Sequence, residues 1–291
     1  MISAFPPFPS SKLLVHVTFY FVGDRIKYLE TVVKNFQSYE FSKIDIIIDT
    51  NSKEALSCLS FENVNPRTTI KFKVHKNLLH PYLLTWQHRS NMSAAINDYD
   101  YFMYLEDDIH IPFKALQRWR QDSDLLYPEG YLRGFLRVEK NKNGVLISAD
   151  QCKRAKVWNL VRVKNSIFYF PHVPYQAFWI CDHQQMIDFI NSPAWQNDNS
   201  DWCIRERAAS GMTQLLRKNH KNQKHNCLIP LDQNDQIPED VLVYHLPNNY
   251  IDMPKYRGAK FSVGELMDLG LLAKIYKNYL KSSIPSEGSL R

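Results

Sequence analysis

Tyr101-Phe-Met-Tyr-Leu-Glu106-Asp107-Asp108-Ile-His110 is the stretch that decides the fold of this chain. Five apolar or aromatic residues run directly into three carboxylates, and a run of this length predicts a buried central strand. Ligands of open α/β sheets bind just beyond the carboxyl ends of the strands. Because three clustered acids repel one another, we expect a cation to offset their charge. The stretch predicts Mg²⁺ or Mn²⁺ carrying a substrate diphosphate, and the alternative is a solvated acidic turn.

The spacing of the acids suggests which of them work together. Residues two positions apart in an extended segment face the same side. We therefore expect Glu106 and Asp108 to act as a pair that binds the metal. Asp107 points elsewhere in this prediction but stays beside the bound nucleotide.

Size and composition indicate an ordinary globular protein. The chain has 291 residues, 44% of them hydrophobic and 23% charged, which is ample for a core. Its formal net charge is +6, and the lysines and arginines are spread along the chain. This balance suits anionic partners, whether sugar nucleotides, acidic glycans, a membrane surface or nucleic acid, and does not choose among them.

The cysteines and the N-terminal residues bear on the cellular compartment. The five cysteines are odd in number, widely spaced and without a CxxC pair, which argues against a disulfide framework and a zinc site. Residues 1–10 lack the basic and apolar regions of a signal peptide, and no run approaches about 18 apolar residues. We expect a cytoplasmic chain with reduced thiols, either soluble or peripheral to a membrane.

Hydrophobic patterns predict alternating strands and helices in the first half. Strands are expected at 12–22, 44–48, 69–75 and 101–105, with helices between them, and this order predicts a mostly parallel, doubly wound sheet. The second half is mixed. It has a helix at 113–125, β-like pieces at 131–139, 145–148, 157–163 and 177–181, helices at 182–191 and 201–216, a strand at 241–244 and a last helix at 262–280.

In this order the elements and the acidic motif resemble those of the GT-A glycosyltransferases, loosely the exostosin-like enzymes. That family carries a DxD-type motif at the end of the fourth strand, and here glutamate replaces the usual first aspartate of the motif. The resemblance covers residues 12–250. It implies one GT-A (Rossmann-like) α/β domain with a mostly parallel central sheet flanked by helices. Its parts would be a nucleotide-binding half at 12–110, a mixed α+β acceptor and catalytic half at 111–260, and a C-terminal helix and tail at 261–291.

The resemblance also implies residues that bind the nucleotide. Thr18 and Tyr20 match the end of the first strand, and Asp49 matches the end of the second. A carboxylate can pair with a base, and an aromatic ring can stack on it. Arg89 matches a basic residue that reaches the diphosphate, for which the planar guanidinium is well shaped. The plain alternatives are a core aromatic at Tyr20, a helix cap at Asp49 and a surface arginine at Arg89.

For catalysis, the resemblance implies an acid at a helix start and a histidine after the late strand. Asp201 matches the acid that serves inverting members as general base, with Asp198 as the fallback, and His245 matches the third metal ligand after Glu106 and Asp108. Neutral imidazole is an acceptable manganese ligand. The alternatives are simple N-terminal capping by Asp201 and a polar surface role for His245.

The predicted activity is a metal-dependent transfer of a sugar from a UDP- or GDP-type nucleotide diphosphate to a glycan or lipid-linked acceptor. The metal would be Mn²⁺ or Mg²⁺. One alternative is a non-catalytic protein that binds sugar nucleotides or glycans on the same scaffold. The other is a metal-dependent nuclease or phosphodiesterase, for which the sequence offers no convincing second set of carboxylates. No nucleic-acid partner is expected.

Overall fold

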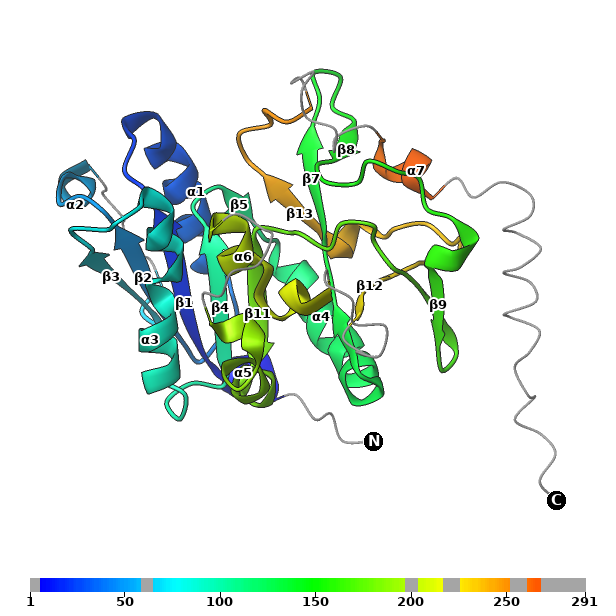
Figure 1. Ribbon diagram of the computed structural model, residues 1–291, viewed down its shortest axis with the longest axis horizontal. Coiled ribbons are helices and arrows are strands. Elements are labelled where there is room, and N and C mark those ends of the chain that lie inside the picture. Colours follow the sequence, from blue (N-terminus) through cyan, green and yellow to red (C-terminus); the bar gives the residue numbers. More distant parts are fainter. Residues whose placement is uncertain (1–5, 59–64, 197–203, 217–225, 252–260, 268–291) are drawn as a thin grey trace.

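The computed structural model describes residues 6–58, 65–196, 204–216, 226–251 and 261–267. Its centre is a five-stranded sheet in the order β11-β4-β1-β2-β3 (Figure 1). The parallel strands are β1 (Lys12–Phe19), β2 (Lys43–Thr50), β3 (Thr68–Val74) and β4 (Tyr101–Glu106), and β11 (Phe178–Asp182) is antiparallel beside β4. The predicted α/β class is therefore confirmed.

Helices cover both faces of the central sheet because its strands are apolar on both sides. Alternate residues of β1 point to opposite faces. Leu13, Val15 and Val17 belong to the same core cluster as the buried side of α1 (Ile26–Phe36). Leu14 packs in a second cluster with Met92 of α3 (His88–Ala94). Continuous burial of this kind explains the unbroken apolar runs of these strands.

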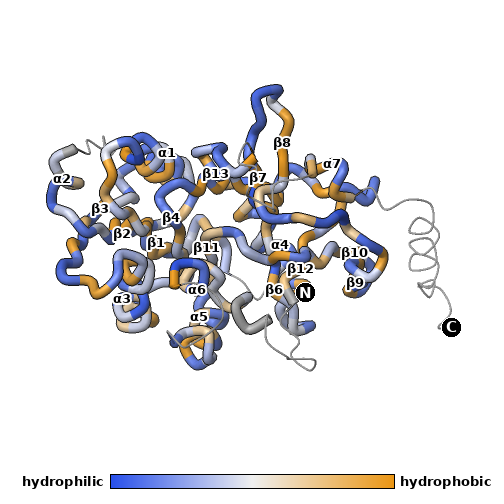
Figure 2. The backbone as a smooth tube through the Cα atoms, turned by 45° about the horizontal axis from the view of Figure 1, so that its top comes forward, coloured by the Kyte–Doolittle hydropathy of each residue, from blue (hydrophilic) through white to orange (hydrophobic). Residues whose placement is uncertain are grey.

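The second half of the chain forms two four-stranded sheets beside the first (Figure 1). One has the order β6-β12-β10-β9 and consists of Tyr131–Arg133, Asn226–Pro230, Ser166–Tyr169 and Leu160–Val163. The other has the order β5-β13-β7-β8 and consists of Ile109–His110, Leu242–His245, Leu136–Lys140 and Leu146–Ser148. The tip of the β7–β8 hairpin, residues 141–144, is hydrophilic (Figure 2).

The remaining helices of the described residues are mostly short. The other α-helices are α2 (Glu54–Cys58), α4 (Phe113–Leu126), α5 (His183–Ile190), α6 (Ile204–Ser210) and α7 (Val263–Leu266). The 3-10 helices are η1 (Phe8–Ser10), η2 (Gly23–Arg25), η3 (Pro81–Trp86), η4 (Tyr127–Glu129), η5 (Val157–Asn159), η6 (Pro193–Trp195), η7 (Gly211–Leu216) and η8 (Glu239–Val241). None of the helices in the described ranges is long and apolar enough to cross a membrane. Cys152, Cys181 and Cys227 are free thiols.

Several helices differ from the sequence-based expectation. Where a helix is expected between the third and fourth strands, the structure has η3 followed by α3. The helix expected over 201–216 changes to 3-10 form at Gly211. Gly211 has a φ of +55°, and a Cβ there would lie 2.8 Å from Trp179 Cγ. A regular helix therefore cannot continue past this residue against β11. Of the helix expected over 262–280, the described residues include only α7.

Replacing Gly211 with alanine should destabilise the protein. The left-handed backbone and the clash with Trp179 together should lower the free energy of unfolding by about 1–3 kcal/mol, measured by chemical denaturation. Gly264→Ala is the matched control, because it lies in α7, has no neighbour within 4 Å of the new Cβ and should be neutral or slightly stabilising. Equal stability of the two variants would contradict the argument.

Candidate functional site

The three acids lie where the central sheet passes into the second half of the chain. Glu106 is the last residue of β4, Asp107 and Asp108 form a turn, and β5 begins at Ile109. β5 pairs with β13 and brings His245 opposite Ile109. Asp107 and Asp108 are only 4% and 3% exposed. Two adjacent carboxylates buried to this degree require compensating charge.

Arg25 supplies part of that charge. Its Nε donates to Asp107 Oδ2 at 2.9 Å, and its Nη2 lies 2.6 Å from Asp107 Oδ1 and 2.7 Å from Asp108 Oδ2. Burial opposes the charged guanidinium, but the contacts with both aspartates outweigh it and raise the pKa of Arg25. Sequence reasoning missed Arg25. The signal was its place just after β1, because β1 is the neighbour of β4 in the sheet.

The two aspartates differ in their electrostatic surroundings. Burial and the adjacent charge of Asp108 raise the pKa of Asp107 above its ordinary value, against the opposing effect of Arg25. Burial acts in the same direction on Asp108, but His245 and Arg25 overcome it and lower the pKa of Asp108. Asp108 is therefore the carboxylate that this environment holds in the ionised form.

His245 lies between two carboxylates. Its Nδ1 is 2.5 Å from Glu139 Oε1, and its Nε2 is 3.3 Å from Asp108 Oδ2. Glu139 is fully buried and also accepts the backbone N–H groups of Tyr250 and Ile251, so it acts here as an acceptor. The Nδ1 of His245 therefore donates to Glu139.

The opposite nitrogen of His245 then faces a second acceptor. Two lone pairs cannot face each other at this distance without a positive charge between them, so Nε2 must carry a proton or meet a cation. Burial lowers the pKa of His245, but the hydrogen bonds to Asp108 and Glu139 outweigh it and raise the pKa. The imidazolium therefore supplies the charge in the absence of a metal.

Glu106 faces a different set of partners. Its Oε1 accepts the Tyr175 hydroxyl at 3.2 Å and lies 3.8 Å from Arg205 Nε. Burial raises the pKa of Glu106, while the charge of Arg205 opposes the rise. The expected pairing of Glu106 with Asp108 differs from this geometry, in which Asp107 and Asp108 share Arg25. The alternation of a strand ends with β4 at Glu106, so it does not apply to the turn that follows.

A divalent cation fits part of this arrangement. Within the described ranges, no three His, Cys, Asp or Glu side chains are grouped as a ready metal site. Of the three expected ligands, Asp108 and His245 lie together, and Asp108 Oδ1 is buried without a hydrogen-bond partner. Glu139 behind His245 is the kind of outer partner that metal-binding histidines have. Carboxylate and imidazole donors suit Mn²⁺, provided that Arg25 yields its place.

A pocket of about 280 Å³ opens beside the acids, between the carboxyl ends of β1 and β4. One wall is apolar and aromatic, and Tyr20 and Tyr82 in it are 44% and 46% exposed. Thr18, Arg25, Glu106, Asp107 and Arg205 provide its polar lining. The pocket thus brings together four predicted residues, which are Thr18, Tyr20, Glu106 and Asp107.

Asp49 lies on β2 but both of its oxygens are engaged. Oδ2 is 2.6 Å from His16 Nδ1, and Oδ1 is 2.7 Å from His75 Nε2. The side chain is fully buried, so it is neither a helix cap nor open to a base. His16 in turn accepts from Asn91 at 2.9 Å. A contact between Asp49 and a nucleotide would require one of these histidines to leave.

Arg89 is not among the residues that line the pocket. Its guanidinium is buried among aromatic rings, with the centroids of Trp195, Phe189 and Trp86 at 4.4, 4.6 and 4.8 Å from its central carbon. Burial lowers its pKa to about 9. The expected contact with a diphosphate is therefore replaced by a cage of rings, and Arg89 is not a surface arginine either. The face of α3 that carries Arg89 points to α5 and η6, away from the pocket.

The cage around Arg89 anchors α6. Nη2 of Arg89 lies 3.4 Å from the Ala208 carbonyl, and the indole N–H groups of Trp86 and Trp179 donate to the carbonyls of Ile204 and Ala208. Arg205 on this helix lines the pocket, which Arg89 does not. The predicted general base Asp201, and Asp198, lie outside the described residues.

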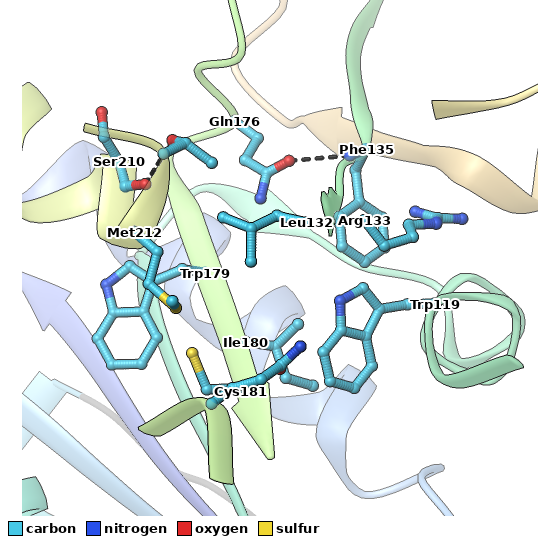
Figure 3. Close-up of a pocket in the computed structure, with 12 residues that line it drawn as sticks. Trp119, Leu132, Arg133, Phe135, Gln176, Trp179, Ile180, Cys181, Ser210 and Met212 are labelled. Carbon is cyan, nitrogen blue, oxygen red and sulfur yellow. Dashed lines mark hydrogen bonds between the residues drawn. The ribbon is translucent and has the colours of Figure 1, made fainter. Parts of the chain in front are cut away.

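A second cavity lies between β11 and the start of the mixed half (Figure 3). It measures about 30 Å³, which is room for water and not for a substrate. Trp179 and Gln176 line it, and Gln176 accepts the backbone N–H of Phe135. These side chains therefore serve packing.

A search of protein-family models and a search of curated protein sequences found no match to this chain. The site geometry alone therefore carries the functional argument.

Truncating Arg89 should test the cage. Arg89→Ala removes the cation from three rings and the contact with α6, and should lower the free energy of unfolding by about 2–4 kcal/mol. Lys34→Ala, on the exposed side of α1, should change it by less than about 0.5 kcal/mol. Urea denaturation of both variants measures the difference, and a wild-type stability for Arg89→Ala would refute the anchoring role.

Proposed function

We propose that the chain is a GT-A-type glycosyltransferase that takes its sugar from a nucleoside-diphosphate donor together with Mn²⁺ or Mg²⁺. The observation that carries the proposal is the pocket at the ends of β1 and β4, where an aromatic wall meets two arginines and buried acids. The strand order β3-β2-β1-β4, with antiparallel β11 beside β4, supports it, since this is the topology in which such a pocket forms beyond the parallel strands.

The aromatic wall suits a nucleobase. Tyr20 and Tyr82 are half exposed, and their rings offer apolar faces on which a base can stack. Thr18 Oγ1 is buried in the same pocket beside the Tyr104 hydroxyl, and it can serve a polar edge of the ligand. These contacts would hold the nucleoside with its phosphates toward the acids.

The charged lining suits a diphosphate leaving group. Arg25 and Arg205 both line the pocket, and guanidinium groups bind phosphate oxygens in a bidentate manner. A metal held by Asp107, Asp108 and His245 would neutralise charge that develops on the diphosphate. Glu139 would keep the Nδ1 proton on His245 and so leave Nε2 as the ligating atom.

The acceptor step needs a base as well as a leaving group. An inverting transfer requires a carboxylate near the acceptor hydroxyl to take its proton. Asp201 remains the predicted base, on the segment that precedes α6. The net charge of +6 is compatible with an anionic glycan acceptor or a lipid-linked one and does not choose between them.

A non-catalytic protein that binds sugar nucleotides is the second candidate. The pairing of Arg25 with both aspartates favours it, because the acids are already compensated without a metal. A nuclease that uses two metals is the less favoured alternative, because the sequence offers no convincing second set of carboxylates for a second metal.

Nucleotide binding provides the first test of the proposal. We expect UDP or GDP with Mn²⁺ to raise the melting temperature of the wild type, since a ligand of the folded state stabilises it. Arg205→Met should weaken the binding about tenfold or more, measured by calorimetry. Arg118→Met is the matched control, because the side chains of Arg118 and Arg205 are 31% and 34% exposed and Arg118 lies on α4, outside the pocket. Equal binding by both variants would argue against the pocket.

Catalysis provides the second test. Wild-type protein should hydrolyse a UDP- or GDP-sugar, or transfer its sugar, with Mn²⁺. Asp108→Asn should lower the rate by about 100-fold or more, because it weakens a ligand of the metal that would neutralise the diphosphate. Asp150→Asn is the control, because it removes a part-buried carboxylate that is paired with Arg137 and lies outside the pocket. Full activity of Asp108→Asn would show that the site is misassigned. Binding without any turnover by the wild type would favour the second candidate.

A further inference from the structure

We propose that Arg25 is a built-in cation that the acids exchange for a metal. In the ligand-free protein it holds Asp107 and Asp108, and when a metal and a nucleoside diphosphate bind together it moves to the phosphate oxygens. Arg25 therefore opposes binding of the metal alone and favours binding of the diphosphate. The inference rests on the proposed function in taking a nucleoside diphosphate as the ligand.

The contacts of Arg25 occupy the atoms that a metal needs. Its guanidinium bonds to both oxygens of Asp107 and to Asp108 Oδ2, at 2.6 to 2.9 Å. Asp108 Oδ1 is left buried and without a hydrogen-bond partner. A divalent cation that binds the two aspartates must therefore displace the guanidinium or approach it closely, and two positive charges at such a distance repel each other.

Arg25 is also placed to leave. It belongs to η2, the turn directly after β1, and its backbone N–H is held by Val22 at 2.9 Å, so a change of side-chain rotamer suffices. Its side chain is 34% exposed and lines the same pocket as Tyr20 and Tyr82. A diphosphate in that pocket would lie within reach and would offer new acceptors in place of the aspartates.

Arg205 provides the contrast. It lines the same pocket, but its carboxylate partners are Glu106 at 3.8 Å and Glu206 at 3.4 Å instead of Asp107 and Asp108. Both arginines can serve a phosphate, but Arg25 alone of the two competes with a metal for the aspartates. Removing them should therefore have effects of the same sign on nucleotide binding and different effects on metal binding.

The exchange makes the two ligands cooperative. Metal alone must break the Arg25–aspartate contacts without a replacement, whereas metal with a diphosphate gives the guanidinium a new partner. Each ligand should therefore raise the affinity for the other by the same factor. The size of this factor measures how far the diphosphate relieves the competition between Arg25 and the metal for Asp107 and Asp108.

Calorimetry with Mn²⁺ alone, UDP alone and the two together tests the inference on wild type, Arg25→Met and Arg205→Met. Arg25→Met should bind Mn²⁺ alone about tenfold more tightly than wild type and Mn²⁺–UDP about tenfold more weakly. Arg205→Met should weaken UDP binding and leave the affinity for Mn²⁺ alone unchanged. Arg25→Lys keeps the charge and should fall between wild type and Arg25→Met in both measurements.

The outcomes separate this inference from the proposed function. If Mn²⁺–UDP binds the wild type but Arg25→Met binds Mn²⁺ no more tightly, the exchange is wrong and the nucleotide site stands. If no nucleoside diphosphate binds in any condition, the proposed function fails. A tighter Mn²⁺ affinity of Arg25→Met would still support the blocking role in that case. Should Arg25→Met fail to fold, by circular dichroism, Arg25→Lys carries the same comparison, and a Mn²⁺ affinity equal to wild type would overturn the inference.

Discussion

The burial of two adjacent carboxylates in the turn after β4 is the constraint on which the site depends. Each buried charge costs several kcal/mol unless it is paired and hydrogen-bonded. Asp107 and Asp108 meet this requirement from two directions, with Arg25 arriving from the end of β1 and His245 from the end of β13. The turn thus joins the central sheet to the second sheet by charge as well as by backbone pairing. A change in either partner alters the electrostatic balance of the other.

The second sheet contributes a prepared imidazole. Glu139 fixes the Nδ1 proton of His245, and Tyr250 stacks on the ring with the centroids 4.6 Å apart. Tyr250 also donates its backbone N–H to Glu139, so the ring and the carboxylate are held as a unit. Nε2 is thereby directed at Asp108 and demands a positive charge between them. In the free protein a proton on Nε2 supplies this charge. A metal bound at the same nitrogen would replace the proton, so metal binding is linked to the protonation of His245.

The sequence predicts the central sheet well because its strands are buried on both faces and appear as unbroken apolar runs. It predicts the mixed half less well, since β5, β10 and β12 have two to five residues each and too short a pattern to recognise. Contacts between side chains that are distant in the sequence could not be predicted either. Nothing local to Asp49 shows that His16 and His75 take its oxygens, and a charged Arg89 on a helix is expected to face water until the surrounding rings are known. Arg25 could be predicted from the sequence, because parallel sheets of this class place β1 beside β4 and Arg25 follows β1 directly.

The two arginines of the pocket differ in the strength of their contacts with carboxylates. We therefore expect Arg205 to bind an entering anion before Arg25 does. Arg205 sits on α6, whose backbone carbonyls accept hydrogen bonds from the cage around Arg89. The carboxylate partners of Arg205 itself are at 3.4 and 3.8 Å. Arg25 has three contacts of hydrogen-bond length with two aspartates. An anion that enters the pocket therefore binds Arg205 at a smaller cost in free energy than Arg25, because the contacts of Arg205 with its carboxylates are longer and weaker. Arg25 follows only when something else compensates the aspartates, and for that reason metal and anion must arrive as partners.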